Sequence, residues 1–173
     1  TISQWRAIDY VTTTEYLTTG NIITTQANNY FPSLYPGLPN EVTTSNSLNG
    51  ITDKVKYHYP STGTLYTQNR LEVLKTEKFE NSTKTNTVNK AYATMSGLYL
   101  PNKIQASLMS NSLEDRIIFH SYYTNGNAKE VSKKDGTHVV YIWGYNQTKP
   151  IAKIDNITYS QIQSSVSNLQ NLS

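Results

Sequence analysis

The sequence predicts an all-β protein made of antiparallel hairpins in a meander, with one helix near the C-terminus. Composition is the first indication, because the chain is rich in Thr, Ser and Asn, holds 14 Tyr and is only 36% hydrophobic. Threonine and tyrosine favour pleated, half-exposed strands over helices. The second indication is a pair of hairpin-type dipeptides, Asn125-Gly126 and Asp135-Gly136, each between runs of strand-forming residues. Residues 116–154 are therefore predicted to form two successive hairpins.

The last strand of that stretch, residues 138–143, is apolar on both alternating faces. One face carries Val139, Tyr141 and Trp143, and the other carries His138, Val140 and Ile142. A strand of this kind is expected to be covered on both sides.

Composition also excludes several classes of protein. The absence of cysteine excludes disulfides and thiolate metal sites. The net charge of +3 is spread along the chain, without a basic window, so nucleic acid is not an expected partner. No apolar run has the roughly 18 to 20 residues of a membrane-spanning helix. Because the sequence begins TISQWRAIDY, without an initiator Met or signal-peptide pattern, we expect a segment of a longer protein.

In the first part of the chain we expect a hairpin from residues 5–19 and 22–26, with its turn at Gly20-Asn21. Residues 28–40 hold three prolines and a glycine and are expected to form a loop. Asn49-Gly50 then predicts a hairpin turn leading into a one-sided strand at residues 54–59.

In the middle of the chain, residues 65–67 are expected to resume a strand, and 70–79 to form another with a bulge near Val73-Leu74. The polar residues 80–90 suggest a long hairpin tip or an edge strand. A short apolar run at 98–100 is closed by Pro101, and residues 103–108 alternate as a one-sided strand.

The C-terminal residues fit a helix better than a strand. Asp155 or Asn156 is the expected cap, and an apolar stripe follows at Ile157, Ile162, Val166 and Leu169. We therefore expect a β-rich repeat-like domain at residues 1–156 and a C-terminal helix or tail at 157–173.

One pattern recurs three times: Tyr, three residues, Gly, one residue, then an apolar residue. It places Tyr16 with Gly20, Tyr59 with Gly63, and Tyr122 with Gly126, and the Asp135-Gly136 turn follows the third copy. Glycine permits the turn, and the tyrosine is positioned to pack across the hairpin. The three tyrosines are unequally spaced, so ordinary hairpin turns in a Tyr-rich chain are the alternative interpretation.

At these residues the chain resembles the RHS-repeat or YD-repeat family. The resemblance is strongest from His120 to Ile162, around DGTHVVYIWGYNQTKPIAKI, which is similar to the C-terminal repeat segment of long exported or cell-surface proteins of Bacteroidota. The three tyrosines are followed by Leu, Pro and Tyr instead of the family's Asp, and regular spacing is missing. The resemblance implies an exported β-rich scaffold of hairpins, which in related proteins encloses a toxin domain.

A catalytic or metal site is not predicted. The three histidines, His58, His120 and His138, would have to combine with Asp9, Asp115 or Asp135 to hold a metal, and their strand positions explain them without one. There is no Gly-x-Ser-x-Gly turn and no Gly-rich phosphate loop. The nearby carboxylate pairs, Glu114-Asp115 and Glu72 with Glu77, are better explained as solvated residues than as a glycosidase pair. We expect no enzyme activity, metal or cofactor.

Aromatic side chains give the alternative function, binding of carbohydrate or adhesion. Flat apolar rings for sugar or protein are offered by Tyr30, Phe31 and Tyr35 in the Pro-rich loop and by Tyr141, Trp143 and Tyr145 at the end of the last apolar strand. The competing interpretation is that these rings pack in the core.

The predicted function is a non-enzymatic, β-rich structural segment of a large secreted or cell-surface RHS-like protein. Carbohydrate binding and a shell fragment of a toxin-delivery protein are the alternatives. Expected partners are another protein or the remainder of a longer polypeptide, with outer-membrane or secretion machinery and glycans as further options. The expected location is extracellular or at the cell surface, associated with a bacterial outer membrane.

Overall fold

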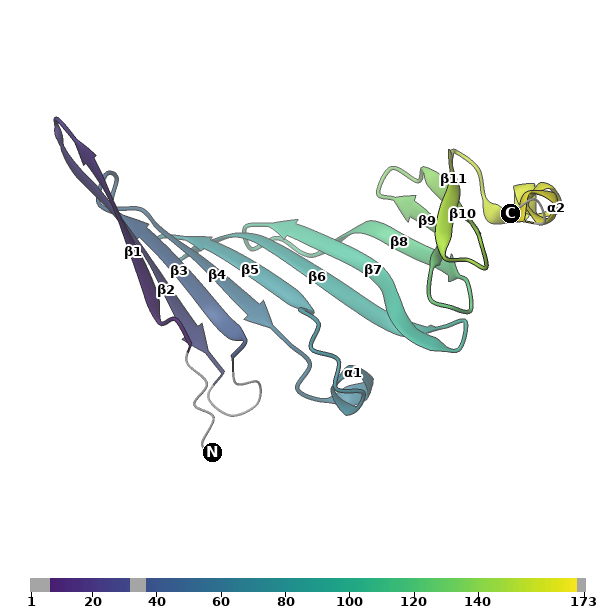
Figure 1. The fold of residues 1–173 in the computed structure, drawn as a ribbon, viewed down its shortest axis with the longest axis horizontal. Helices are drawn as coiled ribbons and strands as arrows, with labels where there is room; N and C mark the ends of the chain where they lie inside the picture. Colours follow the sequence, from purple (N-terminus) through teal and green to yellow (C-terminus); the bar gives the residue numbers. More distant parts are fainter. Residues whose placement is uncertain (1–6, 32–36, 171–173) are drawn as a thin grey trace. The chain divides into compact units, whose positions relative to one another are not determined.

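The computed structural model describes residues 7–31 and 37–170, and in this part of the chain the strands form one open antiparallel meander (Figure 1). Its 11 strands lie in the order β1 to β11, so each pairs with the next strand along the chain. The prediction of a mostly β fold with a short C-terminal helix is confirmed.

The element bounds are as follows. The strands are β1 (Tyr10–Leu17), β2 (Gly20–Tyr30), β3 (Pro39–Asn46), β4 (Thr52–His58), β5 (Lys75–Glu80), β6 (Thr83–Met95), β7 (Leu98–Leu108), β8 (Glu114–Tyr122), β9 (Ala128–Lys133), β10 (His138–Gly144) and β11 (Lys149–Asp155). The helices are α1 (Gly63–Thr67) and α2 (Tyr159–Gln170).

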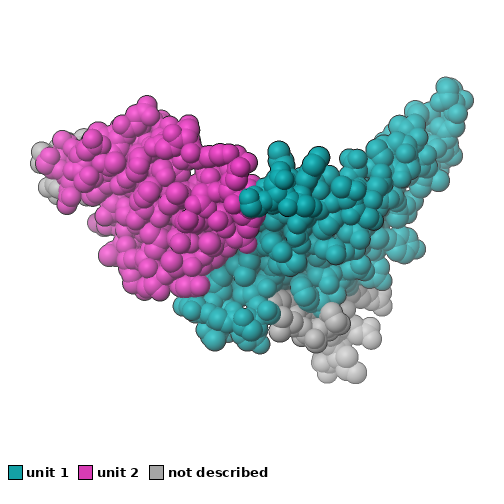
Figure 2. Space-filling model, turned by 180° about the vertical axis from the view of Figure 1, so that it is seen from behind, with its two compact units in different colours: residues 1–88, 107–112 teal, residues 89–106, 113–173 magenta. Residues whose placement is uncertain are grey.

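The chain divides into two compact units, coloured separately in Figure 2. Unit 1 comprises Thr1–Val88 and Ser107–Ser112, and unit 2 comprises Asn89–Ala106 and Leu113–Ser173. Two of the divisions lie within β6 and β7, and the third lies in the turn between β7 and β8.

The core of unit 2 centres on β10. Val139, Val140 and Ile142 are 2%, 0% and 0% exposed, as expected for a strand that is apolar on both faces. Helix α2 packs against β10 and buries Val166. The predicted burial of this strand is confirmed.

Helix α1 corrects the expectation of a strand at residues 65–67. Its five residues, GTLYT, have little helical preference, and Thr62 before them makes no side-chain capping bond. Leu65 is nevertheless only 5% exposed, so burial of one apolar side chain accompanies this turn of helix. The Tyr59–Gly63 pattern thus leads into a helix instead of a second strand.

Strand boundaries differ from the predicted ones in several further places. Strand β2 extends to Tyr30 and β3 begins at Pro39, so both ends of the predicted loop at residues 28–40 lie in strands. Strand β5 begins at Lys75, so residues 70–74 precede it. Residues 83–90 belong to β6, which lies between β5 and β7 and is therefore neither a hairpin tip nor an edge. Pro101 lies inside β7 and does not close it.

The cap of α2 also differs from the predicted one. Thr158, not Asp155 or Asn156, precedes the helix and bonds to Gln161: both its backbone N–H and its hydroxyl donate to Oε1, at 2.8 and 2.9 Å. A Thr and a Gln three residues apart in this arrangement resemble a capping box.

Candidate functional site

The two hairpin turns of unit 2 have the same geometry. In the β8–β9 turn the N–H of Gly126 donates to the carbonyl of Tyr123, and in the β9–β10 turn the N–H of Gly136 donates to that of Lys133, both at 3.0 Å. The side chains of Asn125 and Asp135 each accept from the backbone N–H two residues later.

Only the glycines of these turns adopt positive φ angles, +88° at Gly126 and +81° at Gly136. The Asn and Asp supply side-chain acceptors, a normal role for them in turns. Both predicted hairpins are present, and a third, β10–β11, follows them in the same stretch. In each predicted turn, only the glycine of the dipeptide needs a positive φ angle.

Two of the three repeat tyrosines make the same contact. The Tyr122 hydroxyl donates to the carbonyl of Pro101 at 2.6 Å, and the Tyr59 hydroxyl donates to the carbonyl of Pro39 at 3.2 Å. Burial raises the pKa of both phenols, that of Tyr122 to about 12. Each tyrosine therefore ties the end of one strand to a proline on the preceding strand.

Tyr16 is different, because it is 81% exposed on β1. Its partner across the hairpin is Asn21, and the turn lies at Thr18 and Thr19, two residues earlier than the predicted Gly20-Asn21. Gly20, with a φ of +129°, follows that turn. The three-copy pattern thus contains two equivalent tyrosines and one that is not.

The equivalent tyrosines belong to a longer internal repeat. Residues 39–58 align with residues 101–120 without a gap, and six positions are identical: Pro39/Pro101, Asn40/Asn102, Ser45/Ser107, Asn49/Asn111, Asp53/Asp115 and His58/His120. Several others exchange similar residues, such as Val42 with Ile104.

The two copies also agree in strand pairing. Val42 pairs with Val55 between β3 and β4, and the aligned residues Ile104 and Ile117 pair between β7 and β8, so the register is the same at this end of both ladders. After Ile104 the β7–β8 ladder shifts by one residue, which the β3–β4 ladder does not. The bond from Ser47 N–H to the Ile23 carbonyl has its counterpart from Met109 N–H to the Thr85 carbonyl. Strands β2–β3–β4 and β6–β7–β8 are therefore two copies of one structural unit.

The predicted binding aromatics are engaged in contacts within their own unit. Tyr30 donates from its hydroxyl to the Ile8 carbonyl, and Phe31 lies edge-on to Tyr59 with ring centroids 5.7 Å apart. In unit 2, Trp143 donates from Nε1 to the Ala128 carbonyl, whereas Tyr145 is 56% exposed. Tyr35 lies outside the described residues.

A polar cluster in unit 2 joins His120, Ser132, His138 and Glu130. The two imidazole rings stack with centroids 4.8 Å apart. His120 Nε2 and Ser132 Oγ form a 2.8 Å hydrogen bond, while His138 Nδ1 donates to Glu130 Oε1 at 2.6 Å. The acid contacts His138 and not the histidine beside the serine, so these groups do not form the continuous series of a nucleophilic triad.

Glu130 has a structural role that sequence reasoning missed. Its second carboxylate oxygen accepts from the backbone N–H of Tyr159 at 3.0 Å, at the first residue of α2. A carboxylate is stabilising at a helix N-terminus, where backbone N–H groups are unsatisfied and the dipole is positive. Glu130 therefore links β9, β10 and α2.

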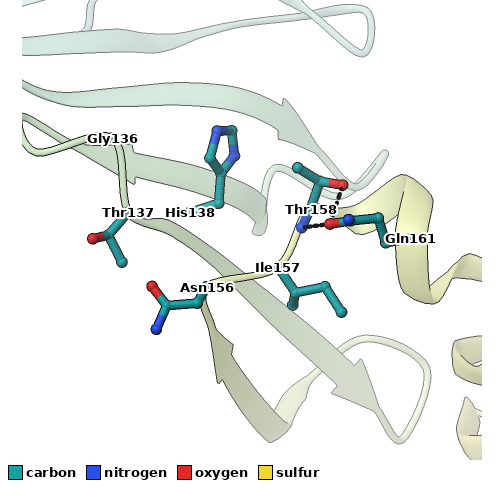
Figure 3. Close-up of a pocket in the computed structure, with 7 residues that line it drawn as sticks. All are labelled: Gly136, Thr137, His138, Asn156, Ile157, Thr158 and Gln161. Atoms are coloured by element: carbon teal, nitrogen blue, oxygen red, sulfur yellow. Dashed lines mark hydrogen bonds between the residues drawn. The ribbon is translucent and has the colours of Figure 1, made fainter.

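An open pocket of about 180 Å³ lies beside this link (Figure 3). The residues that line it are Gly136, Thr137, His138, Asn156, Ile157, Thr158 and Gln161. Thr158 and Gln161 are bonded to each other, as the dashed lines show. The pocket carries no carboxylate pair or cluster of cations on its lining, so it suggests no specific reaction.

The carboxylates considered from the sequence are in ion pairs. The pKa of Glu77 is lowered: burial alone would raise it, but the hydrogen bond from His58 and the charges of Lys75 and Lys84 outweigh burial. The pKa values of Glu114 and Asp115 are also lowered, chiefly by hydrogen bonds from Lys134 and Lys103, respectively.

Metal-binding clusters and membrane-spanning helices are both absent from the described residues. In residues 7–31 and 37–170, no group of three or more His, Asp or Glu side chains is arranged to hold a metal ion. Within the same described part, no helix is long and apolar enough to cross a membrane.

No protein-family model matches the chain, and no curated protein matches it.

Proposed function

We propose that the chain is a non-enzymatic, β-rich structural segment of a large secreted or cell-surface protein of the RHS or YD-repeat type. The observation that carries the proposal is the internal repeat, in which two strand units begin their ladders in the same register and each ends in a tyrosine bonded to a proline carbonyl. Repeated structural units that each contact the next along the chain are typical of scaffolds.

The engaged aromatics favour this role over carbohydrate binding. The Tyr30, Phe31 and Trp143 rings contact backbone or other rings within their own units, which is what packing residues do. Tyr145, with the Lys149 Nζ 5.3 Å from its ring centroid, is the described candidate that presents most surface to a sugar. Loss of glycan-array binding on Tyr145→Ala would favour the carbohydrate alternative, and no binding by the wild-type chain would oppose it.

The main test of the scaffold proposal is to delete one copy of the repeat. Deleting residues 39–100 removes one full period of the repeat and joins Leu38 to Pro101, whose predecessor in the intact chain is also a leucine. Strand β2 then meets β7 in the register it had with β3, so we expect a folded protein with cooperative unfolding. A deletion of half that length from the same starting point breaks the register and is expected to unfold.

Location is tested separately. Antibodies against this chain are expected to label intact cells that express the full gene. Labelling that requires permeabilised cells would contradict an exported or surface location. A shell around a toxin would further require a toxin domain in the same full-length product, which sequencing of the complete gene would reveal.

A further inference from the structure

Strand β1 has an open edge with exposed apolar side chains at both of its ends. It is paired with β2 on one side, and in the described part of the chain its other side is an end of the sheet. Tyr10, Val11, Tyr16 and Leu17 are 68%, 47%, 81% and 50% exposed, and Glu15 is the only charged residue in the strand. A long edge strand with exposed apolar side chains and without proline or lysine is a template for pairing with another strand.

The opposite edge of the sheet is built differently. Strand β11 has the sequence KPIAKID, with two lysines, an aspartate and a proline in seven residues. These are the residues that natural proteins use to block pairing at an edge. The contrast indicates that the open edge of β1, unlike that of β11, is suited to pairing with another strand.

The hydrogen bonds between β1 and β2 determine which backbone groups of β1 point toward the open edge. The N–H of Asn28 donates to the Asp9 carbonyl, and opposed residues in an antiparallel ladder alternate between bonded and non-bonded pairs. The N–H and C=O groups of the alternate residues Tyr10, Thr12, Thr14 and Tyr16 therefore face the open edge.

The second copy of the repeat shows what covers this position. Strand β5 precedes the β6–β7–β8 unit as β1 precedes β2–β3–β4, and its outer edge is paired with β4. Lys54 of β4 lies opposite Phe79, and the Lys56 Nζ lies 5.5 Å from the Phe79 ring centroid. Phe79 stands two residues before the turn at Asn81, as Tyr16 stands two residues before the turn at Thr18.

We infer that the open edge of β1 pairs with a β4-type strand from a further copy of this repeat, supplied by the polypeptide that precedes residue 1. The sequence of such a strand is Asp, basic, aliphatic, any residue, aromatic, His, as in residues 53–58 and 115–120. The strands of this type within the chain cannot serve, because β4 pairs with β3 and β5, and β8 pairs with β7 and β9.

The register follows from the β4–β5 ladder. The β5–β6 turn is superposed on the β1–β2 turn, so that Phe79 takes the place of Tyr16. The basic residue of the incoming strand then lies opposite Tyr16, and its histidine lies opposite Thr12. The residue at the Lys56 position then covers the ring of Tyr16, which accounts for an aromatic side chain that is otherwise 81% exposed. This inference deepens the proposed scaffold role and rests on it.

The test inserts an additional copy of residues 10–72 between Glu72 and Val73 of the full chain. The number of residues from the original His58 to the inserted Thr12 is then the same as the number from His58 to Lys75 in the intact protein. The inserted β1 carries Tyr16→Phe, so that hydrogen-exchange mass spectrometry distinguishes its peptide from that of the original β1. We expect amide exchange about tenfold slower in the inserted β1 than in the original, which serves as the internal control.

The matched control adds Lys56→Pro to the β4 that precedes the inserted copy. The bond from Asn81 N–H to the Thr52 carbonyl places the even-numbered residues of β4 toward β5, so this proline removes a donor toward the inserted strand and none toward β3. The slowed exchange should be lost. Equal exchange in the two β1 copies without the proline would overturn the inference.

A second arm needs no insertion. The isotope-labelled full chain is titrated with a peptide of residues 52–60, and amide shifts are expected in β1 but not in β11, with a scrambled peptide producing neither. An inserted chain that does not fold, together with no peptide-induced shift in β1, would overturn the inference.

If the chain self-associates, the open edge of β1 could pair with a strand of a second copy. A wild-type dimer in analytical ultracentrifugation that Thr14→Pro dissociates would assign the edge to a second copy of the chain and overturn the inference. The deletion of residues 39–100 tests the scaffold without involving the open edge of β1, so the scaffold proposal and the pairing inference fail on different results.

Discussion

Replacing Tyr122 with phenylalanine measures the strength of the tie between β8 and β7. The substitution removes a hydroxyl that donates to the Pro101 carbonyl at 2.6 Å, from a side chain that is 6% exposed. The ring remains, and with it the stacking on Phe119 at 5.6 Å between centroids. Loss of a buried hydrogen bond that leaves its acceptor unsatisfied costs about 1 to 3 kcal/mol, and we expect about 1.5 kcal/mol here.

The assay is urea unfolding followed by the fluorescence of Trp143, in a background with Trp5 replaced by phenylalanine. With a urea m-value of about 2 kcal/mol/M, the midpoint should fall by about 0.7 M while m is unchanged. Tyr16→Phe is the matched control, because the same chemical change at an 81% exposed ring should shift the midpoint by much less. Equal shifts at the two positions would refute the role assigned to the Tyr122 hydroxyl.

Three further predictions concern unit 2. Because burial raises the pKa of Tyr122 to about 12 from an ordinary value of 10.0, stability should be unaffected below about pH 10 and fall as the pH rises toward 12; Tyr122→Phe should flatten this decline in a pH series of urea midpoints. Glu130→Ala removes the acceptor at the start of α2 and should speed exchange of the α2 amides about tenfold, whereas Glu114→Ala, at an exposed carboxylate, should not. Gly136→Ala places a side chain at a φ of +81° and should cost about 1 kcal/mol by thermal unfolding, with Gly136→Asn costing less; equal costs would contradict the role of the backbone angle.

The features that sequence predicted well depend on local chemistry. The Gly126 and Gly136 turns were predictable because positive φ angles select glycine, and the burial of β10 was predictable because both of its faces are apolar. The apolar stripe of α2 was likewise visible from its spacing.

The features that sequence missed depend on distant contacts. Helix α1 has weak helical preference, and the burial of Leu65 depends on surrounding residues that no local pattern reveals. The interior place of β6 could not be derived from its polar side chains, because backbone pairing decides strand order. The acceptors of Tyr59 and Tyr122 are 20 and 21 residues away, so finding them required the strand register.

The repeat itself was only partly visible. The pattern Tyr, three residues, Gly identified its end in two copies, but the interval from Tyr59 to Tyr122 is one residue longer than the period of the strands before them, which concealed that period. Similar residues such as Val42 and Ile104 carry much of the remaining signal, and the pairing of the strands makes their equivalence plain.

The extra residue is Ser121, which lies between His120 and Tyr122 where the first copy has His58 directly before Tyr59. The β8–β9 ladder shifts register on both sides of Ser121, as a bulge does when it accommodates an unpaired residue. Such a bulge allows a single-codon insertion to be absorbed within one strand, while the tyrosine still reaches its proline. Copies of this repeat can therefore diverge in length without losing their fold, and a genomic search for relatives should permit a one-residue gap at this position.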